Sequence, residues 1–230
     1  MIALISDIHG NFPALVATLA AIDAMPVTRI FCLGDTGGYY CQINECCDLL
    51  RERNIFSLRG NHDDYLATGM DCPRSTSANY CLDYQRKIIS NENLNWLKSL
   101  LPSGMFDDLD VVHGGWKNPL DEYVRPSEEY FEDMQSLVFA SGHSHVPCIW
   151  TGELIKYCNP GSVGQPRDGD WRAAFATWDG FGFEVHRVEY DVEDTQRSMF
   201  KAGFAPYFSE NLSKGSRIGG RIDTLETLGL

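Results

Sequence analysis

The stretch IALISDIHGNFP, residues 2 to 13, decides the fold. Its first five residues, IALIS, are a short apolar run that predicts a buried strand. Its end predicts the start of a helix, because Pro13 stands in the first turn, where a missing N–H costs least. Apolar residues then recur at positions 15, 19 and 22, which is helical spacing. A strand that leads directly into a helix is typical of an α/β fold.

Two more strands follow this unit, RIFCL at 29 to 33 and IFSLR at 55 to 59. A second helix is indicated between them by apolar residues at 43, 47 and 50. The alternation of strands and helices predicts a parallel sheet with crossover helices. Beyond Pro147 the pattern changes to hairpins, which we expect to turn at Thr151-Gly152 and at Asp179-Gly180. An α/β beginning and a β-rich end predict two packed sheets with helices outside.

The middle and the end of the chain give weaker signals. We expect a helix from about 78 to 99 and another from 127 to 136, with Ser127 as N-cap. DVVHGG and LVFASGH have the composition of further strands, and a helix is expected after residue 191. Because SKGSRIGGR is rich in small and polar residues, we predict one domain over 1–212 and a flexible tail over 213–230.

Composition and charge limit the classes of protein that this chain can belong to. No run of eighteen apolar residues and no basic leader occur, and the eight cysteines have neither regular spacing nor a C-x-x-C pair. We therefore expect a cytoplasmic protein with reduced cysteines. With 19 basic and 32 acidic residues the net charge is −13, which disfavours bulk nucleic acid and anionic membranes as partners. A local cationic site can still bind a small phosphate ester.

Metal-binding side chains follow five successive predicted strands at their carboxyl ends. They are Asp7 and His9, Asp35, Asn61 and His62, His113, and finally His143 and His145. In open α/β sheets this edge is where ligand sites form, and cations would satisfy polar groups that are costly to bury alone. Taken singly, SDIHG and GNHD are also typical of helix caps and turns. Five of the six histidines in this context favour a metal site, whereas His186, in an alternating strand, is expected to be structural.

The spacing and the types of donor indicate two metal ions. In Asp7-x-His9 and His143-x-His145 the partners are two apart, so an extended backbone would point both to one face. Oxygen and imidazole donors together suit Zn, Mn or Fe better than Ca. Seven such donors exceed the needs of one ion that also binds water, so two ions sharing a carboxylate are the economical interpretation.

The ordered set DIHGN, GD, GNHD, VHGG and GHSH resembles the calcineurin-like metallophosphoesterases. NPGSVGQPRDGD at 159 to 170 and RVEYD at 187 to 191 are similar to later segments of the small bacterial and archaeal members. The resemblance spans about residues 1 to 212. It implies a mixed α/β fold, namely a four-layer αββα sandwich of two mixed β-sheets flanked by helices.

The resemblance also implies the roles of the site residues. One metal would be held by Asp7, His9, Asp35 and His145, and the other by Asp35, Asn61, His113 and His143, with Asp35 as the bridge. His62 matches a histidine that contacts phosphate or protonates the leaving group. A hydroxide bridging the two metals would attack phosphorus. Manganese, iron, zinc and nickel all remain candidates for the metals.

Departures from the pattern narrow the implied function. Where protein Ser/Thr phosphatases of this superfamily carry GDxVDRG, this chain reads GDTGGYY, so Gly38 replaces an aspartate and Tyr39 an arginine. A protein phosphatase is thus less favoured. Asp63 is a candidate for supporting the site, and Arg59 and Arg167 are candidates for binding substrate phosphate, with surface salt bridges as the alternative for both.

The sequence therefore predicts a metal-dependent hydrolase of phosphodiesters or phosphomonoesters, with a small phosphate ester as its partner. A dinucleoside polyphosphate hydrolase is an alternative on the same site. A non-catalytic interaction scaffold of the same fold is an alternative from another class, and a homo-oligomer is compatible with the sequence.

Overall fold

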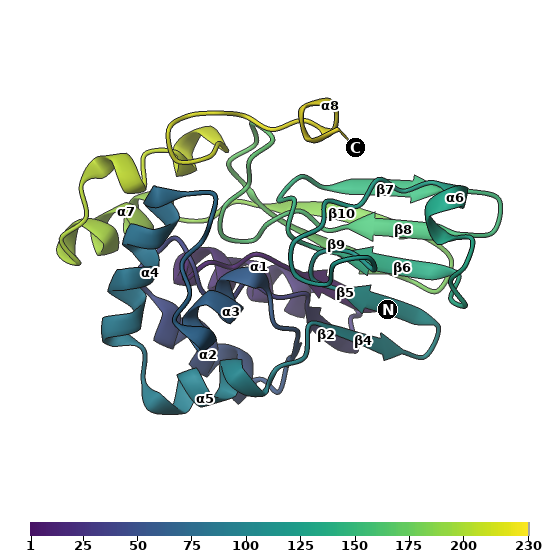
Figure 1. The fold of residues 1–230 in the computed structure, drawn as a ribbon, viewed down its shortest axis with the longest axis horizontal. Helices are drawn as coiled ribbons and strands as arrows, with labels where there is room; N and C mark the ends of the chain where they lie inside the picture. Colours follow the sequence, from purple (N-terminus) through teal and green to yellow (C-terminus); the bar gives the residue numbers. More distant parts are fainter. Residues whose placement is uncertain (230) are drawn as a thin grey trace.

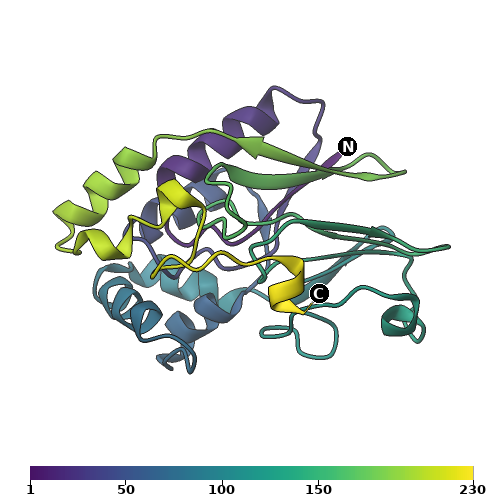
Figure 2. The same ribbon diagram turned by 90° about the horizontal axis from the view of Figure 1, so that it is seen from above.

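Two five-stranded mixed sheets pack face to face with helices outside them (Figures 1 and 2). The structure, a computed structural model, describes residues 1 to 229. The first sheet has the order β10-β9-β1-β2-β3. Its strands β1, β2 and β3 are parallel to one another, β9 is antiparallel to β1, and β10 is antiparallel to β9. Its strands are β1 (Ile2–Ile5), β2 (Arg29–Cys32), β3 (Phe56–Ser57), β9 (Ala173–Trp178) and β10 (Phe183–Val188).

The second sheet has the order β4-β5-β6-β8-β7. Its three central strands are parallel, and both edge strands are antiparallel to their neighbours. The strands are β4 (Ser103–Phe106), β5 (Leu109–Val112), β6 (Val138–Ser141), β7 (Cys148–Thr151) and β8 (Lys156–Asn159). Two mixed sheets packed face to face, with helices outside them, form the αββα sandwich that the sequence predicted (Figures 1 and 2).

The helices are unevenly distributed over the two sheets. They are α1 (Phe12–Asp23), α2 (Ile43–Glu52), α3 (Asn61–Thr68), α4 (Thr76–Ile88), α5 (Asn91–Ser99), α6 (Glu128–Phe131), α7 (Val192–Lys201) and α8 (Leu225–Leu228), with short 3-10 helices at Pro206–Phe208 and Leu212–Lys214. The helices α1, α2 and α7 contribute side chains to the core over the outer face of the first sheet. On the outer face of the second sheet, α6 and the loops around it pack against residues of β6, β7 and β8.

The alternation of side chains along β1 joins the layers. Leu4 points between the two sheets and packs in a buried cluster with residues of β2, β5 and β6. Its neighbours Ala3 and Ile5 belong to the opposite core, under the helices. Because successive side chains of a strand point to opposite faces, one apolar run serves two cores. This explains why the first strand is apolar throughout rather than alternating.

Two predicted helices are shorter than we expected. The helix predicted over 78–99 is two helices, because Ile89 is extended and the Ser90 side chain accepts a hydrogen bond from the Asn93 N–H at 3.1 Å, starting α5. Ser127 is the N-cap as predicted, but α6 ends at Phe131 instead of reaching residue 136. The acidic residues at 132 and 133 would place negative charge at the negative end of a longer helix.

Both predicted hairpins form, with wider turns than expected. The paired residues Thr151 and Lys156 flank a four-residue loop, and so do Trp178 and Phe183. In the second loop the Asp179 carboxylate accepts hydrogen bonds from the backbone N–H groups of residues 181 and 182, at 2.7 and 2.8 Å. The Asp179 side chain thus provides hydrogen-bond acceptors for the N–H groups of the loop, which stabilises a four-residue loop in place of a two-residue turn.

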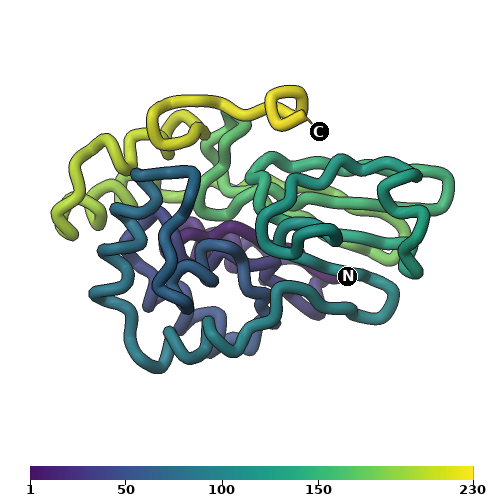
Figure 3. Tube along the Cα trace, viewed as in Figure 1, coloured from purple at the N-terminus to yellow at the C-terminus, as the bar shows by residue number. Residues whose placement is uncertain are grey.

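The C-terminal tail crosses one side of the molecule and ends in α8 (Figure 3). Within it Ser216 and Asp223 are buried. The predicted flexibility of the tail and the domain boundary at residue 212 stay predictions. All eight cysteines lie within the described residues without a disulfide, and seven of them are buried, as expected for reduced core residues. None of the helices in residues 1 to 229 has the length and apolar composition needed to cross a bilayer.

The position of Leu4 between the sheets predicts a large effect on stability. Leu4→Ala should lower the free energy of unfolding by about 2 to 5 kcal/mol, because a fully buried leucine leaves a cavity. Urea unfolding followed by circular dichroism measures this change. Val16→Ala, on the exposed side of α1, is the matched control and should change stability by no more than about 0.5 kcal/mol. Equal effects in the two variants would contradict the prediction.

Candidate metal centre

The predicted metal ligands adopt an unusual backbone conformation. Left-handed φ angles occur at Asp7 (54°), His9 (54°), Asp35 (56°), His143 (65°) and His145 (61°). Positive φ is uncommon outside glycine, although Asp, Asn and His tolerate it better than most residues. Our prediction of an extended backbone at the pairs Asp7/His9 and His143/His145 was therefore wrong. The chain curls at each donor, which directs these side chains toward a common centre.

Hydrogen bonds between segments hold these strained positions in place. The Asp7 N–H donates to the Gly34 carbonyl at 3.0 Å, and the His9 N–H donates to the Asp35 carbonyl at 2.9 Å. The Asp7 carbonyl in turn accepts from the Gly164 N–H at 3.0 Å. Strain of this kind persists only where the surroundings over-determine it, and it concentrates at functional sites.

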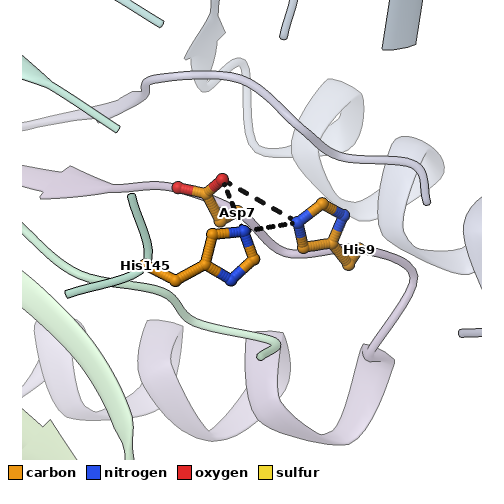
Figure 4. A group of neighbouring side chains, drawn as sticks. All are labelled: Asp7, His9 and His145. Atoms are coloured by element: carbon orange, nitrogen blue, oxygen red, sulfur yellow. Dashed lines mark hydrogen bonds and ion pairs between the residues drawn. The ribbon is translucent and has the colours of Figure 1, made fainter. Parts of the chain in front are cut away.

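Asp7, His9 and His145 form the first of two clusters (Figure 4). His9 Nδ1 donates to the Gly37 carbonyl and His145 Nδ1 to the Gln165 carbonyl, each at 2.7 Å. A neutral ring that donates from Nδ1 has only a lone pair at Nε2. The two Nε2 atoms lie 3.0 Å apart, and the Asp7 Oδ1 atom is 3.2 Å from that of His145. Three electron-rich atoms thus converge on one point.

Asp35, His113 and His143 form the second cluster. His113 Nδ1 donates to the Leu33 carbonyl at 2.8 Å, so its Nε2 also carries a free lone pair, which lies 3.1 Å from Oδ1 of Asn61. The Asp35 carboxylate lies between the clusters, with Oδ2 3.5 Å from His113 Nε2 and 3.7 Å from His9 Nε2. The structure therefore brings together all seven predicted ligands, and it places His143 and His145 in different clusters.

The electrostatics of the two clusters require compensating positive charge. Burial lowers the pKa of His9, His143 and His145 well below the ordinary histidine value, so these rings are neutral at pH 7. Burial, followed by the charges of Asp7 and Asp63, raises the pKa of Asp35 well above the ordinary range. A cation between these carboxylates would reverse that penalty.

The residues present fit two metal ions. Asp7 Oδ1 and His143 Nε2 are fully buried and have no hydrogen-bond partner in the described residues. Buried polar atoms are almost always satisfied, so each such atom needs an explanation. Imidazole rings held by a backbone carbonyl on Nδ1, with Nε2 facing inward, have the arrangement that metal-binding histidines normally show. Each cluster offers mixed nitrogen and oxygen donors, which suit transition metals.

His62 lies beside the centre and lines its cavity. Its backbone N–H donates to Asp35 Oδ1 at 2.8 Å, and its ring lies edge-on to that of His9. Burial, followed by the charge of Arg167, lowers the pKa of His62 to about 3, so the ring is neutral. The Nδ1 atom of His62 is buried and has no hydrogen-bond partner within residues 1 to 229.

The site differs at Gly38 from the pattern of protein phosphatases for a steric reason. A Cβ atom at Gly38 would collide with the His9 ring, and its φ of +133° disfavours any side chain. Asp63 does not replace the missing aspartate beside His62. Its carboxylate instead accepts hydrogen bonds from the N–H groups of Gly37 and Gly60, at 2.8 and 3.0 Å. Asp63 thereby supports the loops that carry Asp35 and Asn61.

A cavity of about 440 Å³ opens onto the second cluster. Arg167 lines it, with its guanidinium carbon 5.4 Å from the centre of the Tyr39 ring. A distant loop thus supplies a guanidinium next to the position where the phosphatase pattern has an arginine. Arg59 does not line the cavity and lies 3.5 Å from Asp64, so the salt bridge, the alternative for this residue, is what the structure shows.

The sequence interpretation missed several residues that line the cavity. They are Arg74, Tyr123, Arg217 and Arg221. No motif or spacing marks them, and two lie in the glycine-rich tail, whose composition suggested only flexibility. His186 has the structural role that we expected, because it hydrogen-bonds Thr177 at 2.8 Å and stacks on Phe175.

Comparisons with known proteins agree with this geometry. A family model described as the calcineurin-like phosphoesterase superfamily domain matches residues 1–179. An uncharacterised protein of Methanocaldococcus jannaschii is 37% identical over 248 residues, covering 94% of this chain and 98% of that protein. The crystal structure of a metallophosphoesterase from Sphaerobacter thermophilus is 31% identical, with a TM-score of 0.82 over 93% of this chain and 98% of its own. A hypothetical protein from Pyrococcus horikoshii, at 20% identity, supports the fold with a TM-score of 0.83 over 94% of this chain and all of its own.

The separation of the two clusters predicts separate effects on metal content. We expect the protein to bind two Mn²⁺ ions per chain, and His145→Ala and His143→Ala each to bind about one, since each removes a donor from a different cluster. Competition between the two variants and a chelator of known affinity, followed by elemental analysis, measures this. His186→Ala is the matched control and should retain both ions. Full metal content in both cluster variants would contradict the assignment.

Proposed function

Because the chain belongs to the calcineurin-like phosphoesterase superfamily, we propose that it is a metal-dependent hydrolase of small phosphodiesters or phosphomonoesters. The observation that carries this proposal is the pair of buried clusters, which border an open cavity. Within residues 1 to 229, one inward-facing atom of each cluster, Asp7 Oδ1 and His143 Nε2, has no hydrogen-bond partner. A structural metal site would be closed to ligands, whereas a catalytic site keeps an open position.

The proposed ligand sets follow the two clusters. Asp7, His9 and His145 would hold one ion, His113, His143 and Asn61 would hold the other, and Asp35 would serve both. When bound, two such ions supply an activated water and neutralise charge on the phosphoryl oxygens. The backbone carbonyls behind His9, His113 and His145 fix the ring tautomers, so that Nε2 of each ring is available to an ion.

Arg167 binds the phosphoryl group of the substrate in this proposal. It is only 4% exposed, and its Nε and Nη2 atoms donate to the uncharged Oε1 of Gln165, at 2.9 and 2.6 Å. No carboxylate in residues 1 to 229 lies within ion-pair distance of this guanidinium. A buried cation without a counter-ion is costly, and a phosphate that accepts a two-pronged hydrogen bond would compensate for that cost.

His62 acts on the ester oxygen in this proposal. Its ring is fixed among those of His9, Tyr39 and Tyr65 and borders the cavity. A neutral imidazole can donate its one N–H to a phosphoryl or leaving oxygen. Positioned proton transfer or donation of this type contributes about 10² to 10⁴ in rate.

The other functions suggested by the sequence rank lower. A protein phosphatase is disfavoured, because Gly38 has no room for the aspartate of that pattern. A non-catalytic scaffold would need neither buried metal-donor atoms without a hydrogen-bond partner nor a cavity beside them. We propose a cytoplasmic location for the enzyme, in line with its unpaired cysteines.

The proposal predicts hydrolysis that depends on metal and on His62. Protein loaded with Mn²⁺ should hydrolyse 4-nitrophenyl phosphate or bis(4-nitrophenyl) phosphate, and it should lose this activity on chelation and regain it with Mn²⁺. Asp35→Asn should have the same effect as chelation. His62→Ala should lower kcat at least about tenfold while keeping both ions, because it removes a group that acts on the ester and not on the metals.

His186→Ala is the control for histidine replacement and should keep full activity. Activity that persists after chelation and in Asp35→Asn would refute the proposal. Two bound ions without hydrolysis of any ester, tested also with Zn²⁺, Fe²⁺ and Ni²⁺, would instead favour the scaffold.

A further inference from the structure

The C-terminal segment, residues 216–228, forms part of the wall of the cavity at the metal centre. It contributes Arg217, Ile218, Arg221, Thr227 and Leu228. Figures 1 and 3 show this segment leaving the helical side of the molecule and crossing to the side of the second sheet. It lies beyond residue 179, where the match to the family model ends. Its contribution to the cavity is therefore separate from the features that identify the family.

Backbone hydrogen bonds fix this segment to the loop that carries Arg167. The Asp223 N–H donates to the Arg167 carbonyl at 2.7 Å, and the Gly215 carbonyl accepts from the Gly169 N–H at 2.9 Å. Within the segment, the Arg217 N–H donates to the Arg221 carbonyl at 2.8 Å, which closes a tight turn. The two glycines between them have φ of +92° and +89°, a conformation that other residues rarely adopt.

The charges in this turn do not balance. The Asp223 carboxylate is fully buried and accepts hydrogen bonds from Nε of Arg217 at 2.5 Å and from Nε of Arg221 at 3.0 Å. One carboxylate thus serves two guanidinium groups, which leaves a surplus of one positive charge. Arg217 also hydrogen-bonds the phenol of Tyr123, but within residues 1 to 229 Asp223 is the only carboxylate in ion-pair distance of either arginine. By contrast, Arg74 on the same cavity is paired with Asp121.

The cavity therefore has two separate sites with unbalanced positive charge. One is Arg167, beside the metal centre, and the other is the turn of Arg217 and Arg221. The two arginines of the turn are 31% and 60% exposed, so a ligand can reach them from the cavity. A volume of about 440 Å³ lies within the range of pockets for drug-sized ligands and exceeds the needs of one phosphate group.

We propose that the turn of Arg217 and Arg221 binds a second phosphate group of the substrate, distinct from the phosphate that is hydrolysed. This inference rests on the proposed function, and it narrows the substrate class to small phosphate esters that carry two phosphates. Guanidinium forks match phosphate oxygens in geometry as well as in charge. A long polyanion is disfavoured by the net charge of −13, which confines attraction to this local site.

The test compares three probes with the Mn²⁺-loaded protein. AMP carries one phosphate, ADP adds a second through an anhydride, and adenosine 3′,5′-bisphosphate adds a second through a separate ester. At least one of the two diphosphorylated probes should have a kcat/KM, or a Kd by calorimetry if it is not hydrolysed, at least about tenfold better than AMP. The better of the two shows how the second phosphate is linked.

Arg217→Ala and Arg221→Ala should each reduce this preference to about threefold or less. Each single variant leaves Asp223 with one arginine, so the buried carboxylate keeps a partner and the segment should stay in place. An unchanged thermal midpoint and metal content verify this. Arg197→Ala, on the exposed face of α7, is the matched control and should keep the preference.

A protein that treats all three probes alike would overturn the inference, and so would a preference that survives in both variants. Failure of the proposed function is distinguishable from these outcomes. In that case no ester is hydrolysed under any metal, while the calorimetric comparison of the three probes still decides whether the second phosphate is recognised.

Discussion

The face-to-face packing of the two sheets is the constraint on which the rest of the molecule depends. Each cluster takes donors from both sheets, since Asp7 and His9 meet His145 from across the interface, while Asp35 meets His113 and His143. Neither cluster exists in one sheet alone. The apolar layer around Leu4 therefore does more than stabilise the fold, because it sets the distance between the two halves of the site.

The sequence predicted the members of the site but not their backbone. Strand ends could be located because apolar runs stop at Asp7, at Asp35 and at His143, and parallel strands end at a common edge. The left-handed conformation of these residues could not be predicted in this way. It depends on hydrogen bonds between segments that are distant in the sequence, such as Asp7 to Gly34 and Gly164 to Asp7. Helix ends were misjudged for a different reason, because single residues such as the N-cap Ser90 decide them locally, whereas the prediction followed the spacing of apolar residues.

The arginines of the cavity show the limit of reading motifs from the sequence. Arg167 was a candidate because it lies in a segment with a family resemblance, whereas Arg217 and Arg221 lie in a glycine-rich stretch that predicted only disorder. In the structure those glycines permit a turn that a buried aspartate holds together. The same glycine-rich composition fits both a flexible linker and a tight turn. Only the hydrogen-bond partner of the arginines, Asp223, distinguishes the two, and the composition does not reveal it.

The left-handed donors restrict how the metal centre can change over evolutionary time. Aspartate, asparagine and histidine are the side chains that best tolerate this backbone, and they also include the side chains that bind metals. The backbone conformation and the metal-binding chemistry therefore favour the same few residue types at five positions, namely Asp7, His9, Asp35, His143 and His145. The metal preference can change through substitutions among aspartate, asparagine and histidine. A substitution by any other residue type with a side chain removes a metal donor and also strains the left-handed backbone. Loss of the metal centre would therefore be abrupt rather than gradual.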